Sequence, residues 1–438
     1  GTRQGTVPWY DWAASIIGGT TCGYLVIRYP ALADLYSTLP TDAVVVGTIL
    51  IVLTAEGLRR TVGPVLFYVF AIFIAFGLLG QFVPAPLTGH PIQLPEMATH
   101  LAFDTNSLMG TPRRAVTTTV VAFLLMGGLL LHSGGTAFFT DLSIALMGRY
   151  RGGSAKIAVT ASGMFGSISG SVVSNVVSTG VITIPLMRDG GYRAHSAAAI
   201  EAVASTGGQL MPPVMGAAAF LMAEFLEVPY SAVVLAALVP AVLYYAALFF
   251  QADLEAIKYG IVRVDASAIP ALGRVLLQGW IFSVPFAVLI YTLFWMNWPP
   301  EVSALAASAV LLIEGLLFGY QGKRMRLPDI GKAVSDTGIN VLDIMMIAAA
   351  AGMIIGILNQ SGLGFALTIL LLEAGGHNLF LLLGLAAVVC IVLGMGMPTV
   401  GVYILLATLV APAMVNVGLD PMAEHLYVLY FLMMSMVT

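Results

Sequence analysis

The stretch GSISGSVVSNVVSTG, residues 166–180, places serine and threonine hydroxyls, an asparagine amide and glycines inside an otherwise apolar sequence. Hydroxyl oxygens and backbone carbonyls freed from a helix are hard oxygen ligands for small cations. A helix that begins beyond such a break carries partial positive charge at its N-terminus, where a carboxylate can bind. These residue types therefore favour a site for a cation and an organic anion.

Two further segments interrupt apolar runs. GMGMPTVGVY, residues 394–403, places glycines and Pro398 before the hydroxyl of Thr399. STGGQLMPP, residues 205–213, lies near the middle of a helix expected over 196–223, where its glycines and prolines would unwind the helix and expose carbonyls. Small and hydroxylated residues in membrane helices more often serve close packing. Three breaks in related positions favour ligand binding instead.

Two carboxylates, Glu201 and Glu224, flank the central break. An ionisable residue within a membrane is a functional-site hypothesis by default, and proton coupling is the role it suggests here. A solvated charge near an interface is an equally weighted alternative. Catalysis is not expected, because the sequence has no HExxH or GxSxG motif or paired His/Asp spacing.

The elements that carry these segments are expected to be membrane helices. Of the 438 residues, 59% are hydrophobic and 9% are charged, whereas soluble domains carry about a quarter charged residues. The sequence predicts an all-α polytopic membrane protein in a lipid bilayer, with no nucleic-acid partner and no organic cofactor. Apolar runs long enough to span occur near 12–30, 41–57, 64–83, 115–134, 230–250, 275–296, 301–320 and 338–358.

The segment before the first polar tip is too short to cross a bilayer. Residues 154–165 would rise about 18 Å as a helix, against a hydrocarbon core of about 30 Å. We therefore expect a re-entrant hairpin over 154–188, on the cytoplasmic side according to the flanking basic residues. No Lys or Arg follows Lys332, so a second hairpin over 378–415 is expected on the external side.

The two hairpin regions belong to an expected internal repeat. Shifting the chain by about 227 residues aligns HSGGTAFF (132–139) with QSGLGFAL (360–367), and PLMRDGG with PAMVNVG. Opposite orientation of two such halves is typical of secondary transporters. The counterpart of the second break falls just past the last residue, so the sequence is expected to be truncated. The expected organisation is 1–94, leading transmembrane helices; 95–229, a first repeat with hairpin 154–188 and broken helix 196–223; 230–327, scaffold helices; and 328–438, a second repeat with hairpin 378–415.

These stretches, with EAVASTGGQLMPPVMGAAAFLMAE, resemble the membrane permease of tripartite ATP-independent periplasmic (TRAP) transporters, and most nearly the fused permease of the TAXI subfamily. The resemblance covers about residues 95–438, and 1–94 look like a fused small-subunit region. It implies an inverted-repeat, elevator-type secondary transporter in the prokaryotic cytoplasmic (inner) membrane. Arg113 and Arg114 depart from the family pattern, where a small apolar pair is usual.

The resemblance implies uptake of a small organic acid, a dicarboxylate such as 2-oxoglutarate or glutamate, from a periplasmic substrate-binding protein. Sodium (Na+) is the implied coupling ion, with protons (H+) through Glu201 or Glu224 as an alternative. A related divalent-anion symporter that needs no binding protein is a second alternative. The implied ligands are Ser171, Asn175, Gly207 and Pro212 for one sodium ion; Gly394, Pro398, Ser435 and Thr438 for a second; and Ser167, Ser169, Gly170, Gln209 and Thr399 for substrate.

Overall fold

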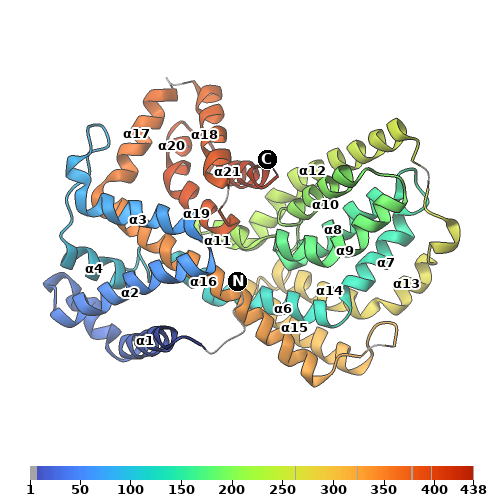
Figure 1. The fold of residues 1–438 in the computed structure, drawn as a ribbon, viewed down its shortest axis with the longest axis horizontal. Helices are drawn as coiled ribbons and strands as arrows, with labels where there is room; N and C mark the ends of the chain where they lie inside the picture. The colour runs from blue at the N-terminus through green and yellow to red at the C-terminus, as the bar shows by residue number, and fades with distance from the viewer. Residues whose placement is uncertain (1–6, 262, 323, 376–377, 396, 438) are drawn as a thin grey trace. The chain divides into compact units, whose positions relative to one another are not determined.

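The computed structural model describes residues 7–261, 263–322, 324–375, 378–395 and 397–437 (Figure 1). These residues form helices joined by turns and short loops, which confirms the predicted all-α class. The chain divides into two compact units, residues 1–114 with 342–424 and residues 115–341 with 425–438. Three helices contribute residues to both units: α5 (Thr111–Ala115), α16 (Leu327–Ser361) and α21 (Pro421–Ser435).

The remaining α-helices belong to one unit each. The first unit contains α1 (Trp9–Leu35), α2 (Thr41–Thr61), α3 (Pro64–Leu79), α4 (Leu94–Phe103), α17 (Leu363–Gly375), α18 (Leu379–Gly394), α19 (Thr399–Leu409) and α20 (Ala411–Asn416). The second contains α6 (Val121–His132), α7 (Gly135–Met147), α8 (Gly153–Ser169), α9 (Val172–Asp189), α10 (Ala194–Gly208), α11 (Ala217–Phe225), α12 (Tyr230–Tyr259), α13 (Leu272–Gln278), α14 (Trp280–Phe294) and α15 (Pro300–Leu317).

Within the described part of the chain, seven helices are long and apolar enough to cross a membrane. An eighth span is possible if the segments Ala266–Gln278 and Trp280–Phe294, which bend by 55°, act as one. The expected run at 12–30 lies in α1, which is outside this set. The seven are Thr41–Thr61, Pro64–Phe82, Thr111–His132, Tyr230–Tyr259, Pro300–Leu317, Leu327–Ser361 and Thr399–Asn416.

Helices α8 and α9 form an antiparallel hairpin in the second unit. A two-residue turn joins them: Gly170 ends α8 with φ +60°, and Ser171 caps α9 by accepting a hydrogen bond from the Ser174 N–H. Glycine suits this turn because a side chain disfavours the left-handed conformation. The hydroxyl oxygens of Ser162 and Thr179 are 3.0 Å apart. Residues equally far from the turn along the two helices therefore lie opposite each other.

Helix α9 buries its polar face and exposes its apolar one. Asn175, Thr179 and Thr183 are buried at intervals of four residues, whereas Val173 and Val177 on another face are exposed. Residues four apart lie on one side of a helix. Burying hydroxyls requires polar partners on the neighbouring helices, because an unpaired buried polar group is costly. The partners lie on α8 and α10, which pack against α9 and lie alongside it in Figure 1.

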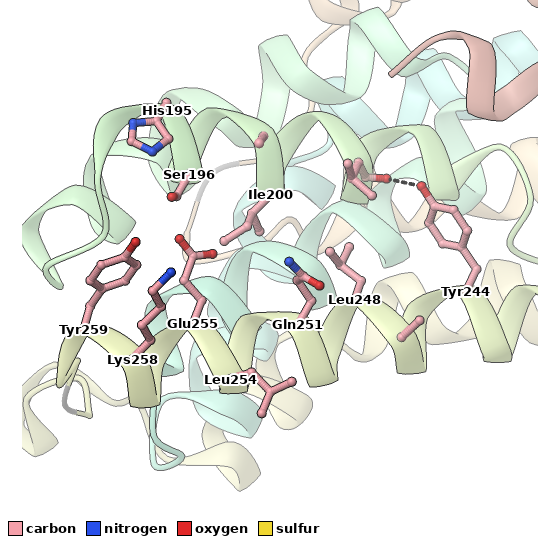
Figure 2. A pocket seen from close by; sticks show the side chains of 13 residues that line it. His195, Ser196, Ile200, Tyr244, Leu248, Gln251, Leu254, Glu255, Lys258 and Tyr259 are labelled. Atoms are coloured by element: carbon pink, nitrogen blue, oxygen red, sulfur yellow. Dashed lines mark hydrogen bonds between the residues drawn. The ribbon is translucent and has the colours of Figure 1, made fainter. Parts of the chain in front are cut away.

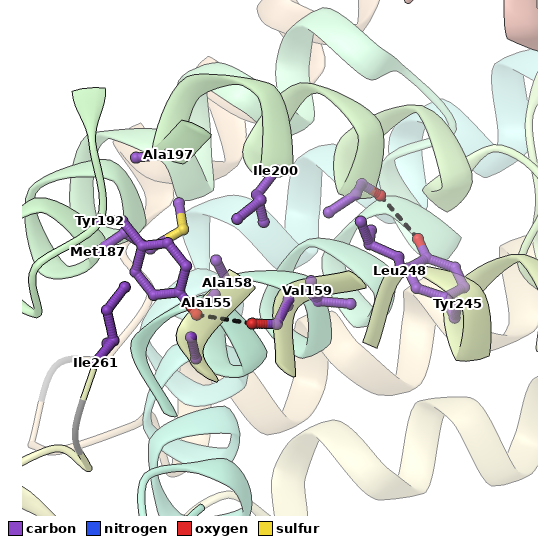
Figure 3. Close-up of a cluster of buried hydrophobic side chains, with 13 residues drawn as sticks. Ala155, Ala158, Val159, Met187, Tyr192, Ala197, Ile200, Tyr245, Leu248 and Ile261 are labelled. Atoms are coloured by element: carbon purple, nitrogen blue, oxygen red, sulfur yellow. Dashed lines mark hydrogen bonds between the residues drawn. The ribbon is translucent and has the colours of Figure 1, made fainter. Parts of the chain in front are cut away.

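The hairpin packs against α10 and α12 through small side chains. Ala155 and Ala158 of α8 join Ala197 of α10 and Ala252 of α12 in one buried cluster (Figure 3). Alanines allow close backbone approach, which is how membrane helices commonly associate. The Tyr245 hydroxyl in the same cluster donates to the carbonyl of Ala204 at 2.8 Å.

Two helices have bounds that differ by the offset of the expected repeat. Helix α10 spans Ala194–Gly208 and α21 spans Pro421–Ser435, the same spacing of 227 residues at both ends. Gly134 before α7 and Gly362 before α17 both adopt positive φ, +96° and +75°. The expected repeat aligns these two glycines, and both have a backbone conformation that favours glycine.

Candidate functional site

Glu201 lies at the centre of a hydroxyl cluster between the hairpin and α10. Its side chain is 0% exposed. The hydroxyl of Ser162 on α8 donates to Oε1 at 2.8 Å, and Thr179 of α9 does so at 2.6 Å. Thr183 of α9 donates to Oε2 at 2.6 Å, and Ser205 of α10 to Oε1 at 3.1 Å. Within the described residues no Lys, Arg or His forms a salt bridge with this carboxylate.

Asn175 links the same three helices one turn nearer the tip. Its amide nitrogen donates to the carbonyl of Ser162 at 2.8 Å and to that of Ser205 at 3.4 Å. Its Oδ1 accepts from Thr179 at 3.3 Å. Asn175 and Glu201 therefore belong to one continuous polar network, which Thr179 joins by contacting both.

Two glycines permit this close approach. A Cβ atom on Gly166 would lie 2.6 Å from the Cα of Gly208 and 2.5 Å from the Asn175 amide nitrogen. A Cβ on Gly208 would lie 2.5 Å from the Cα of Gly166. Contacts this short with backbone atoms cannot be relieved by a rotamer change, so α8 and α10 require glycine at both positions.

The hairpin tip is fastened to the break after α10. The Gln209 side-chain amide donates to the carbonyl of Gly170 at 2.8 Å. Ser167 donates to the carbonyl of Met164 at 2.8 Å, and the buried Ser169 hydroxyl has no hydrogen-bond partner among the described residues. Ser169 thus offers a polar atom at the tip to which no described residue hydrogen-bonds.

The break itself runs from the end of α10 to the start of α11. It contains Pro212 and Pro213, joined by a cis peptide bond. The hydroxyl of Tyr230 donates to the carbonyls of Pro213 and Val214, which holds the unwound segment against α12. The Gly207 carbonyl accepts from the Leu210 N–H at 2.9 Å.

Charged and aromatic groups fix the other end of the hairpin to α12. Arg151 and Lys156 each contact the carboxylate of Asp253 at 2.6 Å. Burial, together with the nearby Glu255 and Asp253 carboxylates, raises the pKa of Tyr192 to about 12. Tyr192 therefore stays neutral and donates to the Ala252 carbonyl at 3.0 Å.

Replacing Gly170 with alanine should destabilise the tip. The left-handed conformation costs a residue with a Cβ about 1–2 kcal/mol, and this Cβ would also lie 2.9 Å from the Met215 carbonyl oxygen. Gly260→Ala is the matched control, because Gly260 has φ +64° with nothing within 4 Å. Thermal unfolding should show Gly170→Ala to be less stable than Gly260→Ala by at least about 1 kcal/mol. Equal losses would contradict the close contact at the tip.

The first predicted ion set lies entirely in the second unit. Ser171 caps α9, Asn175 bridges the three helices, Gly207 lies near the end of α10 and Pro212 lies in the break. Of the two predicted carboxylates, Glu201 is in the network, whereas Glu224 is half-buried near the end of α11.

The second set is divided between the units. Gly394 ends α18 and Pro398 is the N-cap residue of α19, both in the first unit. Thr399, which was predicted for the substrate site, begins α19 in the same unit. Ser435 ends α21 in the second unit, where its hydroxyl donates to the Leu432 carbonyl at 2.6 Å. Thr438 lies outside the described residues.

Four members of the network were given no individual role from the sequence: Ser162, Thr179, Thr183 and Ser205. Thr179 and Ser205 lie within the polar stretches 166–180 and 205–213, whereas Ser162 and Thr183 lie outside them. Their spacing carried a usable signal. Thr179 and Thr183 follow Asn175 at intervals of four, and Ser205 follows Glu201 by four. Helical spacing predicts that each series shares one helix face.

The fold resembles that of a known transporter. The crystal structure of the YdaH transporter from Alcanivorax borkumensis, described as having an unusual topology, superposes with a TM-score of 0.58 and 16% sequence identity. The match covers 84% of this chain and 87% of that one. The likeness at this identity concerns the fold. With the apolar helices described above, it defines an all-α, multi-pass membrane protein with a transporter fold.

The sequence identifies the family. Residues 48–438 match the model of the tripartite ATP-independent periplasmic transporter, DctM component, and the chain belongs to this family. The match begins earlier than residue 95, where the motif resemblance starts. The chain is accordingly a multi-pass protein of the prokaryotic cytoplasmic membrane.

Several relatives are named as permease proteins of TRAP transporters. The C4-dicarboxylate TRAP transporter large permease protein DctM of Pseudomonas aeruginosa is 27% identical over 309 residues, 69% of each chain. Its Vibrio cholerae namesake is 24% identical, over 73% of this chain and 74% of that protein. The sialic acid TRAP transporter permease protein SiaT of Haemophilus influenzae is 33% identical over 94 residues, 21% of this chain and 15% of SiaT. Permeases of this family work with a periplasmic substrate-binding protein and carry small anions.

Proposed function

We propose that this protein carries out ion-coupled secondary active uptake of a small organic acid, delivered by a periplasmic substrate-binding protein. The substrate class we propose is a dicarboxylate such as 2-oxoglutarate or glutamate, and the subfamily is TAXI. Relatives named for C4-dicarboxylates support a dicarboxylate. The single observation that carries ion coupling is the Glu201 network, in which hydroxyl groups of α8, α9 and α10 surround a fully buried carboxylate.

Sodium is the coupling ion that we propose first. An ionised carboxylate in a low-dielectric interior needs compensating positive charge, and hydroxyl dipoles supply it only in part. The described residues offer no basic side chain to Glu201, so a transported cation is a suitable partner. Ser171, Asn175 and the carbonyls of Gly207 and Pro212 supply the neutral oxygen-rich surroundings that a hard cation prefers.

Proton coupling is the second candidate, and the same carboxylate favours it. Glu201 contacts hydroxyls that can either donate to a carboxylate or accept from a carboxylic acid. A hydroxyl shell of this kind tolerates both protonation states, as a proton carrier requires.

We further propose that transport follows an elevator mechanism, with substrate held near Ser167, Ser169, Gly170 and Gln209. The unsatisfied hydroxyl of Ser169 at the hairpin tip supports the substrate position. The α8–α9 hairpin, the aligned bounds of α10 and α21 and the transporter fold of YdaH support the architecture.

Uptake into proteoliposomes tests the proposed partner. Radiolabelled dicarboxylate should accumulate under an inward sodium gradient when the cognate binding protein is present, and remain near background without it. Equal accumulation of free substrate without the binding protein would instead favour a symporter that works alone.

Replacing Asn175 or Thr399 with alanine should weaken ion dependence without preventing expression. Asn175→Ala removes the amide that bridges the carbonyls of Ser162 and Ser205, and the loss of such a hydrogen bond costs about 1–3 kcal/mol. We expect a rise of about tenfold in the cation concentration for half-maximal uptake. An unchanged half-maximal concentration in both variants would contradict the placement.

A further inference from the structure

A groove of about 750 Å³ lies between α10 and α12, and Glu201 is not among the residues that line it (Figure 2). Its floor is apolar, with buried Ile200 and Leu248, and Leu254 stands exposed at its side. Polar groups gather at one end, where His195, Lys258 and Tyr259 lie close together in Figure 2. A groove that is apolar along its length and charged at one end suits an amphipathic ligand.

Two cations lie near the ring of Tyr259: Lys258, which lines the groove with Tyr259, and Arg193, which lies beside the lining and contacts the same ring. The Arg193 guanidinium lies 4.6 Å from the centroid of the Tyr259 ring, and the Lys258 ammonium lies 5.4 Å from it. Among the described residues neither forms a salt bridge, whereas the neighbouring Asp253 is paired with Arg151 and Lys156. Glu255 is the carboxylate that lines this end. Arg193 and Lys258 therefore retain N–H donors for an external anion.

The groove has the length of one lipid leaflet. Its lining on α12 runs from Tyr244 to Tyr259, over which a helix rises about 22 Å. A bilayer with its headgroups is about 40–45 Å thick, so one leaflet measures about 20–22 Å. The basic residues at the α12 end place that end on the cytoplasmic side, where anionic headgroups meet basic pockets between helices.

We propose that this groove binds one anionic phospholipid of the cytoplasmic leaflet. Its phosphate lies against Arg193 and Lys258, and an acyl chain runs along Ile200 and Leu248. The site is separate from the proposed transport route and does not depend on the transported substrate.

Retention of lipid by the purified full chain tests this site. The protein would be reconstituted with phosphatidylglycerol and phosphatidylethanolamine, purified in detergent, and its bound lipid measured by native mass spectrometry. Near a membrane each Lys or Arg contributes about 1 kcal/mol to anionic lipid binding, or about fivefold. Arg193→Gln with Lys258→Gln should therefore lower phosphatidylglycerol retention about 25-fold.

Three further variants keep the test specific. Arg193→Lys with Lys258→Arg should retain the lipid. Ala247→Phe, which narrows the apolar channel, should reduce retention. Arg274→Gln is the matched control, because Arg274 is an exposed arginine on α13 outside the groove, and it should leave retention unchanged.

Equal retention of the two lipids, or an equal loss with Arg274→Gln, would overturn the proposal. Displacement of the bound lipid by millimolar glycerol phosphate would also overturn it, since it would show that the headgroup end alone determines binding. A second copy of the protein seated in the groove would overturn it as well, and would appear as a dimer without retained lipid.

Discussion

Replacing Glu201 with glutamine should lower ion-driven uptake at least about tenfold while the protein remains folded. Glutamine has nearly the same shape, and its side chain can still bond to Ser162 and Thr179. Thr183 can turn its hydroxyl hydrogen to the carbonyl of Thr179, 3.0 Å away. The fold is therefore largely preserved, whereas the negative charge that would attract a cation or carry a proton is lost.

The matched control is Glu224→Gln, because Glu224 flanks the same break but lies outside the network. Its uptake should stay within about twofold of the unmodified protein. The uptake that remains in Glu201→Gln distinguishes the two coupling ions. If sodium is coupled, the sodium concentration for half-maximal uptake should rise. If protons are coupled, uptake should no longer depend on pH, while exchange of substrate across the membrane is retained. Normal uptake with normal ion dependence would exclude Glu201 from coupling.

Replacing Gly208 with valine should separate α8 from α10 and abolish uptake. The first added carbon alone would lie 2.5 Å from the Cα of Gly166 and 3.1 Å from the Asn175 amide nitrogen. Overpacking of this kind costs about 1–3 kcal/mol or more, and the shift would also break the hydrogen bonds of Asn175. We expect a lower thermal unfolding temperature together with loss of uptake.

Gly338→Ala provides the comparison for this variant. Gly338 lies in helix α16 of the same unit, and a Cβ there would meet nothing within 4 Å. Alanine stabilises a helix interior by about 0.5–1 kcal/mol relative to glycine, so this variant should be as stable as the unmodified protein and fully active. Thermal stability of Gly208→Val equal to that of Gly338→Ala would show that the helices do not approach as described.

Much of the hairpin follows from the sequence. Glycine with serine at 170–171 supplies both a left-handed turn and a helix cap. The turn is shorter than expected, because α8 continues to Ser169, whereas the expected first arm ended at residue 165. The break after α10 follows equally from Pro212, which cannot continue a helix. Each of these features depends on local chain geometry, which residue type dictates directly.

The partners of Glu201 are less accessible to sequence reasoning. Spacing alone indicates that Thr179 and Thr183 share the face of Asn175, but it does not say which helix that face meets. That choice depends on Gly166 and Gly208, whose lack of side chains sets the distance between α8 and α10. The glycines were expected to unwind helices, whereas Gly208 also serves as a contact surface. The register between two helices depends on tertiary packing, and the periodicity within one helix does not predict it.

The most direct test of the account is the initial rate of dicarboxylate uptake into proteoliposomes with the cognate binding protein. It would be measured under a sodium gradient alone, a proton gradient alone, both, and neither. The account predicts that uptake by the unmodified protein requires at least one of the two gradients. In Glu201→Gln, uptake should either become slow or no longer depend on a gradient. Uptake that proceeds equally under all four conditions would contradict ion coupling at the Glu201 network.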